Sequence, residues 1–119
     1  MNNDFAIFRY ADILLTKAEA MARKNGDWNN GPVLDIVNQI RTQHGGVDPF
    51  KSLTASTFLA ERGREMFAEN WRRQDMIRFG VYNDAFLFHE KDSDEHVNIF
   101  PIPATQLNAN KNLKQNPGY

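Results

Sequence analysis

Residues 61–80 read ERGREMFAENWRRQDMIRFG, a stretch in which charged side chains alternate with large apolar ones. Glu61, Glu65 and Glu69 recur at intervals of four, so a helix places them on one face. Like charges at this spacing repel each other unless cations lie between them. The aromatic residues among them need cover from water, which indicates that the stretch is partly buried. It therefore predicts a charged helix that packs into the protein.

Arginines beside these carboxylates favour a structural ion-pair network over a catalytic site. Arg62 lies three residues before Glu65, and Glu69 lies four residues before Arg73, spacings at which opposite charges meet on a helix. Pairing with a guanidinium lowers the pKa of a carboxyl group and makes it a poor general acid. The two-carboxylate mechanism of glycoside hydrolysis instead requires a carboxyl group with a raised pKa in a cleft. We therefore expect no catalytic residue here.

Two helices are predicted on the N-terminal side of this stretch. The first covers 5–24, because apolar residues recur at spacings of four and three along one face: Ile7, Ala11, Leu14, Ala18 and Met21. Gly26 suits the left-handed cap that ends it. The second covers 31–44, with Pro32 in its first turn. A short turn joins the two helices into an αα-hairpin, but a helical solenoid needs about three such repeats and only one is visible.

The charged stretch itself is divided into two helices. The third predicted helix covers 55–71, and either Thr54 or Ser56 can cap its start. A fourth, short helix covers 73–79. No window alternates well enough to predict more than a short strand, so the expected fold class is all-α. A length of 119 residues predicts a single unit over 1–119.

The C-terminal residues 98–119 are rich in proline and asparagine but too apolar for a disordered segment. Pro101 and Pro103 hold the chain extended around Ile102. We expect an ordered coil tail that packs on the helices, over the first or the third, and serves structural closure.

Several classes of function are excluded or disfavoured by composition. The net charge of −1 gives no electrostatic case for nucleic acid, and the absence of cysteine excludes thiolate metal sites. Asp92 and Asp94 have the alternate spacing of a calcium loop, but the turn glycine and closing glutamate are missing, so a solvated loop is favoured over a metal site. His44 is expected to help close its helix, and Trp28 to form a half-buried wedge rather than a stacking platform. We expect no cofactor.

Four segments, in order along the chain, resemble the SusD/RagB family of outer-membrane nutrient-binding lipoproteins. They are FRYADILLTKAEAMA (8–22), VLDIVNQIRTQHGG (33–46), ERGREMFAENWRRQDMIRFG (61–80) and FPIPATQLNANKNLKQNPGY (100–119). The last two are highly specific. Asn70, Gln106 and Lys111 depart from the family's pattern. The charged residues of the third segment agree with it; they are Glu61, Arg62, Glu65, Glu69, Arg72, Asp75 and Arg78.

The resemblance implies a non-catalytic protein of Bacteroidetes that takes part in polysaccharide utilisation. Such proteins bind a glycan or another nutrient at the cell surface and sit as a lid over a SusC-like TonB-dependent transporter. It also implies an α-helical fold with tetratricopeptide-like hairpins. Family members are several times longer and the match is to their C-terminal end. We therefore expect a structural C-terminal part, with the lipid anchor and most of the ligand-binding region upstream of Met1.

The same resemblance gives nine charged residues a scaffold role and leaves the ligand-binding residues unknown. These nine are Arg9, Asp12, Glu61, Arg62, Glu65, Glu69, Arg72, Asp75 and Arg78. Starch, another glycan or a peptide all fit as the ligand. Two alternatives from other classes stay open: a free-standing helical protein-interaction module, and an enzyme of the two-carboxylate kind.

Overall fold

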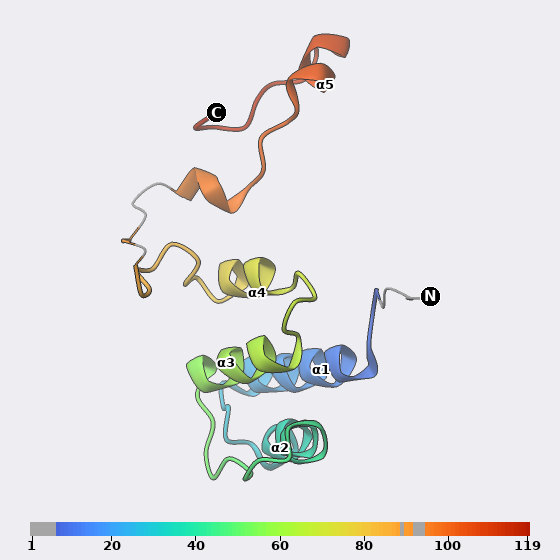
Figure 1. Ribbon diagram of the computed structural model, residues 1–119, viewed down its shortest axis with the longest axis vertical. Helices are drawn as coiled ribbons and strands as arrows, with labels where there is room; N and C mark the ends of the chain where they lie inside the picture. The colour runs from blue at the N-terminus through green and yellow to red at the C-terminus, as the bar shows by residue number, and fades with distance from the viewer. Residues whose placement is uncertain (1–6, 89, 92–94) are drawn as a thin grey trace. The chain divides into compact units, whose positions relative to one another are not determined.

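A computed structural model describes residues 7–88, 90–91 and 95–119 of the chain. Within that part the regular elements are helices and there is no β-strand, which confirms the predicted all-α class (Figure 1). The elements are α1 (Tyr10–Asn25), α2 (Gly31–Gly45), α3 (Ala55–Glu65), α4 (Arg72–Arg78), the 3-10 helix η1 (Glu95–Asn98) and α5 (Ala104–Ala109).

The chain divides into two compact units, Met1–Asp75 and Met76–Tyr119, where we predicted one. The physical basis is the distribution of the core. Every fully buried apolar side chain of the described residues belongs to the first unit, among them Leu15, Val37 and Phe58 at 0% exposure. The second unit instead depends on hydrogen bonds between its own turns.

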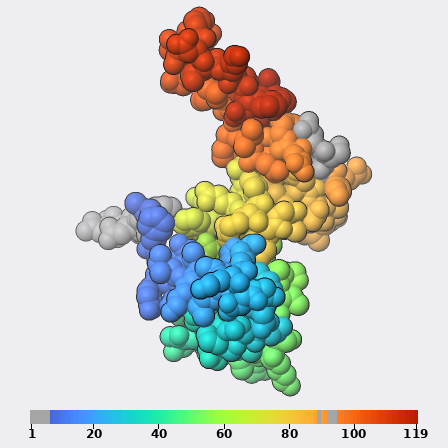
Figure 2. Space-filling view, turned by 180° about the vertical axis from the view of Figure 1, so that it is seen from behind, coloured from blue at the N-terminus to red at the C-terminus, as the bar shows by residue number. Residues whose placement is uncertain are grey.

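The first unit is built on the predicted αα-hairpin. α1 packs against α2 across the connection 26–30, and the side chains of the two helices form a continuous surface in blue and cyan (Figure 2). Gly26 and Gly46 both take the left-handed conformation that ends each helix. Trp28 is half-buried in the connection, with its ring 5.0 Å from that of Phe58 in α3. It is thus a wedge, as predicted, but one that packs against the third helix.

α1 begins later than the predicted residue 5, and its buried face is rotated. Residues 1–6 lie outside the described part of the chain, and Arg9 is extended with φ −117° and ψ 156°, so the helix begins at Tyr10. Leu14 is only half-buried, whereas Ile7 is 69% exposed. The rotation brings two carboxylates inside with the apolar residues; the buried face is Ala11, Asp12, Leu15, Ala18, Glu19 and Ala22.

α3 has the predicted start but a much earlier end. The Thr54 hydroxyl accepts from the Thr57 backbone N–H at 3.1 Å, and the Thr57 hydroxyl accepts from the Thr54 N–H at 2.8 Å. This reciprocal capping box identifies Thr54, not Ser56, as the N-cap. The helix ends at Glu65 instead of residue 71 because Ala68 and Asn70 have φ of 63° and 65°, values that a right-handed helix does not allow.

In the second unit the chain from Ile99 onward folds back on itself. The Gln115 side chain accepts from the Ile102 N–H at 2.8 Å and donates to the Ile102 carbonyl at 2.9 Å. The Tyr119 hydroxyl donates to the Ile99 carbonyl at 2.9 Å. The short helix α5 lies inside this loop, where the sequence predicted coil. Packing of the tail over the first or third helix stays a prediction.

Candidate functional site

A single buried guanidinium, that of Arg62, connects three helices of the first unit. Its Nη2 lies 2.7 Å from Oδ1 of Asp12 in α1, and its Nε donates to Oδ2 of Asp75 in α4 at 2.8 Å. The side chains of Arg62, Asp12 and Asp75 are 3%, 6% and 1% exposed. The guanidinium also lies over the Trp71 ring, with Cζ 5.8 Å from its centroid. One guanidinium thus contacts two buried carboxylates.

A second guanidinium, that of Arg9, joins the start of α1 to the end of α3. Its Nη1 donates to Oε1 of Glu65 and its Nε to Oε2 of Glu69, both at 2.9 Å. Its Nη2 donates to the backbone carbonyl of Glu65 at 2.7 Å, which satisfies one of the free carbonyls at the helix end. The hydrogen bond from Arg9 to the Glu69 carboxylate raises the pKa of Arg9 above its ordinary value.

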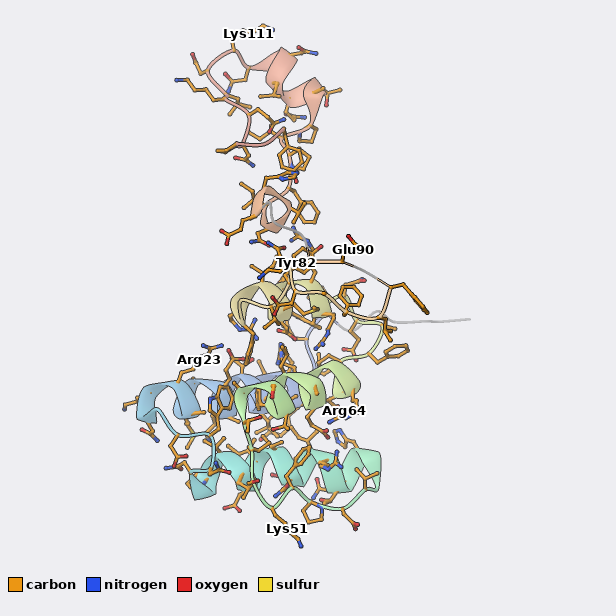
Figure 3. All side chains as sticks on the ribbon, turned by 90° about the vertical axis from the view of Figure 1, so that its left-hand side faces the viewer. Arg23, Lys51, Arg64, Tyr82, Glu90 and Lys111 are labelled. Atoms are coloured by element: carbon orange, nitrogen blue, oxygen red, sulfur yellow. The ribbon has the colours of Figure 1, made fainter. Side chains whose placement is uncertain are left out.

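The carboxylate of Glu61, which lies in α3, is held by two arginines. Arg41 of α2 donates to Oε2 of Glu61 at 2.9 Å, and the Nε of Arg64 donates to the same oxygen at 2.9 Å. Arg64 lies toward the end of α3 (Figure 3). Every one of the three glutamates therefore has a guanidinium nitrogen at 2.9 Å. This is the ion-pair network that the sequence indicated.

The partners within the network differ from those predicted by spacing along one helix. Arg62 binds Asp12 and Asp75 rather than Glu65, and Glu65 binds Arg9 instead. His44 does not act only at its own helix end, because its Nδ1 lies 3.0 Å from Oε1 of Glu65.

The remaining arginines of the predicted scaffold, Arg72 and Arg78, are the first and last residues of α4. Arg72 donates to the Leu59 carbonyl at 3.0 Å, passing so close to Gly63 that an added Cβ there would lie 2.8 Å from its Nη1. Arg78 lies over the Phe79 ring, with Cζ 5.6 Å from its centroid. Arg72 thus joins α4 to α3, whereas this contact of Arg78 is with its neighbour in the chain.

The predicted metal alternative falls mostly outside the described part of the chain. Asp92 and Asp94, the two residues with calcium-loop spacing, lie outside the described residues. Among the residues that are described, no group of three or more His, Asp or Glu side chains is placed to hold a metal ion. Over the same part of the chain, no helix combines the length and apolar character that crossing a membrane requires.

The second unit contains a cavity of about 420 Å³ that sequence reasoning missed. It lies where the end of α4, the turn after it and η1 meet within this unit, and most of its lining side chains are polar. The stretch 81–97 matches no helical or strand period, so its sequence predicts a loop and no site.

Comparison with known proteins identifies the family to which this helical chain is related. Residues 1–98 match the family model described as the SusD family. The chain belongs to the SusD family. It is 30% identical to the starch-binding protein SusD of Bacteroides thetaiotaomicron over an alignment 126 positions long, gaps included, which covers 99% of this chain. The crystal structure of a SusD superfamily protein from Parabacteroides distasonis superposes with a TM-score of 0.70 at 32% identity over 97% of this chain.

Both SusD relatives are much longer than this chain. The match spans 22% of the length of the starch-binding protein and 27% of the chain in the crystal structure. The comparison therefore confirms the predicted family and its helical fold, and it concerns a minor part of each relative.

Proposed function

We propose that this chain is the structural C-terminal part of a SusD-like protein that binds a glycan and delivers it to a SusC-like TonB-dependent transporter. The observation that carries the proposal is the 30% identity to the starch-binding protein SusD over 99% of the chain. Because the match spans 22% of that relative, the larger share of glycan binding is assigned to the rest of the whole protein.

The proposed role in binding is non-catalytic. The carboxylates of Glu61, Glu65 and Glu69 are engaged by Arg9, Arg41 and Arg64, so they serve to hold the helices together. Glycoside hydrolysis needs a carboxyl group that can release a proton to the leaving oxygen. A glutamate whose carboxylate is hydrogen-bonded to guanidinium groups is better suited to holding helices together than to donating that proton.

The proposed location is the outer membrane, at the cell surface, with a lipid anchor outside this chain. This follows the family resemblance of the four sequence segments. Protease treatment of intact cells tests it, since an exposed protein is degraded while periplasmic proteins survive. Survival of the protein alongside them would contradict the location.

Affinity electrophoresis tests the binding itself. The protein, as its own cells produce it, is run in native gels containing starch, xylan or arabinan, and we expect retardation by at least one glycan. The glycan recovered afterwards should show no new reducing ends. Unretarded migration in every gel would overturn the proposed glycan binding, and hydrolysis would overturn its non-catalytic character. Co-purification of a TonB-dependent transporter with the tagged protein tests the partner.

A further inference from the structure

The cavity of the second unit has the polarity of a site for a hydroxylated molecule. Its volume of about 420 Å³ falls within the range of small-molecule sites, roughly 300–1,000 Å³. Drug-like sites are lined mainly by apolar side chains, whereas most residues here are polar. They are Tyr82, Asn83, Asp84, Lys91, Glu95 and Asn98. Tyr82, which follows α4, is labelled in Figure 3.

Two amide groups in this lining have unused hydrogen-bonding capacity. The side-chain oxygens of Asn83 and Asn98 are buried and accept no hydrogen bond from any described part of the protein. A buried acceptor without a donor is unfavourable, and most such groups in folded proteins are satisfied by protein, water or ligand. Since no donor among the described residues binds these oxygens, each can accept a hydrogen bond from a molecule in the cavity.

The charges of the lining restrict what that molecule is. Asp84 and Glu95 supply carboxylate acceptors, and Lys91 supplies one ammonium donor, so the excess of negative charge disfavours an anion. A sugar hydroxyl both donates and accepts, and therefore matches amide oxygens, carboxylates and an ammonium group together. The Tyr82 ring adds an apolar surface of the kind on which a sugar ring packs.

We propose that this cavity is a binding site for a neutral sugar unit, with Asn83 and Asn98 accepting hydrogen bonds from its hydroxyl groups. The proposal rests on the proposed glycan-binding function. It adds that the residues lining this cavity contribute a sugar contact of their own, beside whatever the rest of the whole protein supplies.

Titration of the ¹⁵N-labelled chain with maltose, cellobiose or xylobiose tests the site by nuclear magnetic resonance. With at least one disaccharide, we expect saturable shifts of the side-chain amide signals of Asn83 and Asn98. Asn83→Ala and Asn98→Ala should each weaken the affinity for the disaccharide about tenfold, because each removes one well-formed hydrogen bond. Asn108→Ala, at an exposed position of α5 outside the cavity, is the matched control and should bind like the unchanged chain.

Lys91→Ala keeps the test available if either asparagine variant fails to fold, because Lys91 is exposed. It should weaken the same disaccharide severalfold. Absence of shifts with all three sugars, shifts confined to residues outside the cavity, or a response to calcium chloride alone would each overturn the site. The gel experiment on the whole protein is independent of this titration, so retardation there without shifts here would remove the cavity site and leave the proposed function standing.

Discussion

At the scale of single residues, the charged side chains of 61–78 could be assigned a structural role from sequence, but their partners could not. Spacing rules describe neighbours within about one helical turn, such as Glu19 and Arg23, whose side chains lie 2.8 Å apart. Arg9 and Glu65 are 56 residues apart in the chain. Such a pair depends on how the helices pack, which no local pattern encodes.

Replacing Arg62 by methionine should lower the free energy of unfolding of the first unit by about 3–5 kcal/mol, because two buried carboxylates lose their cation. Urea denaturation followed by tryptophan fluorescence measures this, since both tryptophans, Trp28 and Trp71, belong to the first unit. Arg64→Ala is the control. Its side chain is 56% exposed, so the expected loss is about 0–1 kcal/mol. Equal stability of the two variants would contradict a stabilising role for the buried contacts.

Glu65→Gln should lower the free energy of unfolding by about 1–2 kcal/mol, since a neutral amide replaces a carboxylate bound by Arg9 and His44. The value is kept below that of a fully buried pair because the Arg9 side chain is 31% exposed. Glu69→Gln, at a side chain 25% exposed, should cost less. The same denaturation assay compares them, and a reversed order would disagree with the geometry.

At the scale of elements, helix starts were easier to predict than helix ends. The start of α3 at residue 55 follows from hydroxyl side chains that cap it, which are visible in the sequence. Its end depends on left-handed backbone at Ala68 and Asn70, a conformation that alanine rarely adopts. Arg9, from a distant part of the chain, stabilises that end through the Glu65 carbonyl. Local propensity alone therefore predicted too long a helix.

Thr54→Ala should lower the free energy of unfolding by about 1 kcal/mol, because the Thr57 N–H loses its acceptor. Ser56→Ala tests the alternative cap. Its hydroxyl contacts only that of Thr54, at 2.9 Å, so its loss should change stability much less. Thermal unfolding of the two variants gives the comparison, and a larger effect at Ser56 would show that the cap is assigned to the wrong residue.

Gly63→Ala should leave stability nearly unchanged, although alanine favours a helix by about 1 kcal/mol over glycine. The new Cβ would lie 2.8 Å from Nη1 of Arg72 and displace it from the Leu59 carbonyl, which offsets the gain. In an Arg72→Ala background the same change should therefore stabilise by about 1 kcal/mol. A double-mutant cycle measures the difference, and identical effects in both backgrounds would rule out the steric coupling.

At the scale of the whole molecule, sequence predicted the class and the family but neither the two units nor the cavity. Apolar periodicity identifies α1, α2 and α3 because their buried faces form one core. The second unit has no such core among its described residues, and single hydrogen bonds such as those of Gln115 decide its course. Asparagine and glutamine occur in many loops, so their positions in the sequence do not predict such hydrogen bonds.

Gln115→Ala should speed hydrogen exchange of the Ile102 amide about tenfold, because that N–H loses its acceptor and the loop opens more often. Lys114→Ala, at the exposed neighbouring position, should leave the exchange rate unchanged. Exchange measured by nuclear magnetic resonance at single amides distinguishes the two. Unaltered exchange in Gln115→Ala would show that the amide contact does not hold the loop closed.

The two aspartates bound by Arg62 also bear on the order of events during synthesis. Asp12 leaves the ribosome long before Arg62, whereas Asp75 follows Arg62 by 13 residues and is the last residue of the first unit. A nascent chain that stops inside 66–74 has its arginine but lacks one of the two anions that bind it. The first unit can therefore reach its final charge balance only after the opening turn of α4 has been translated.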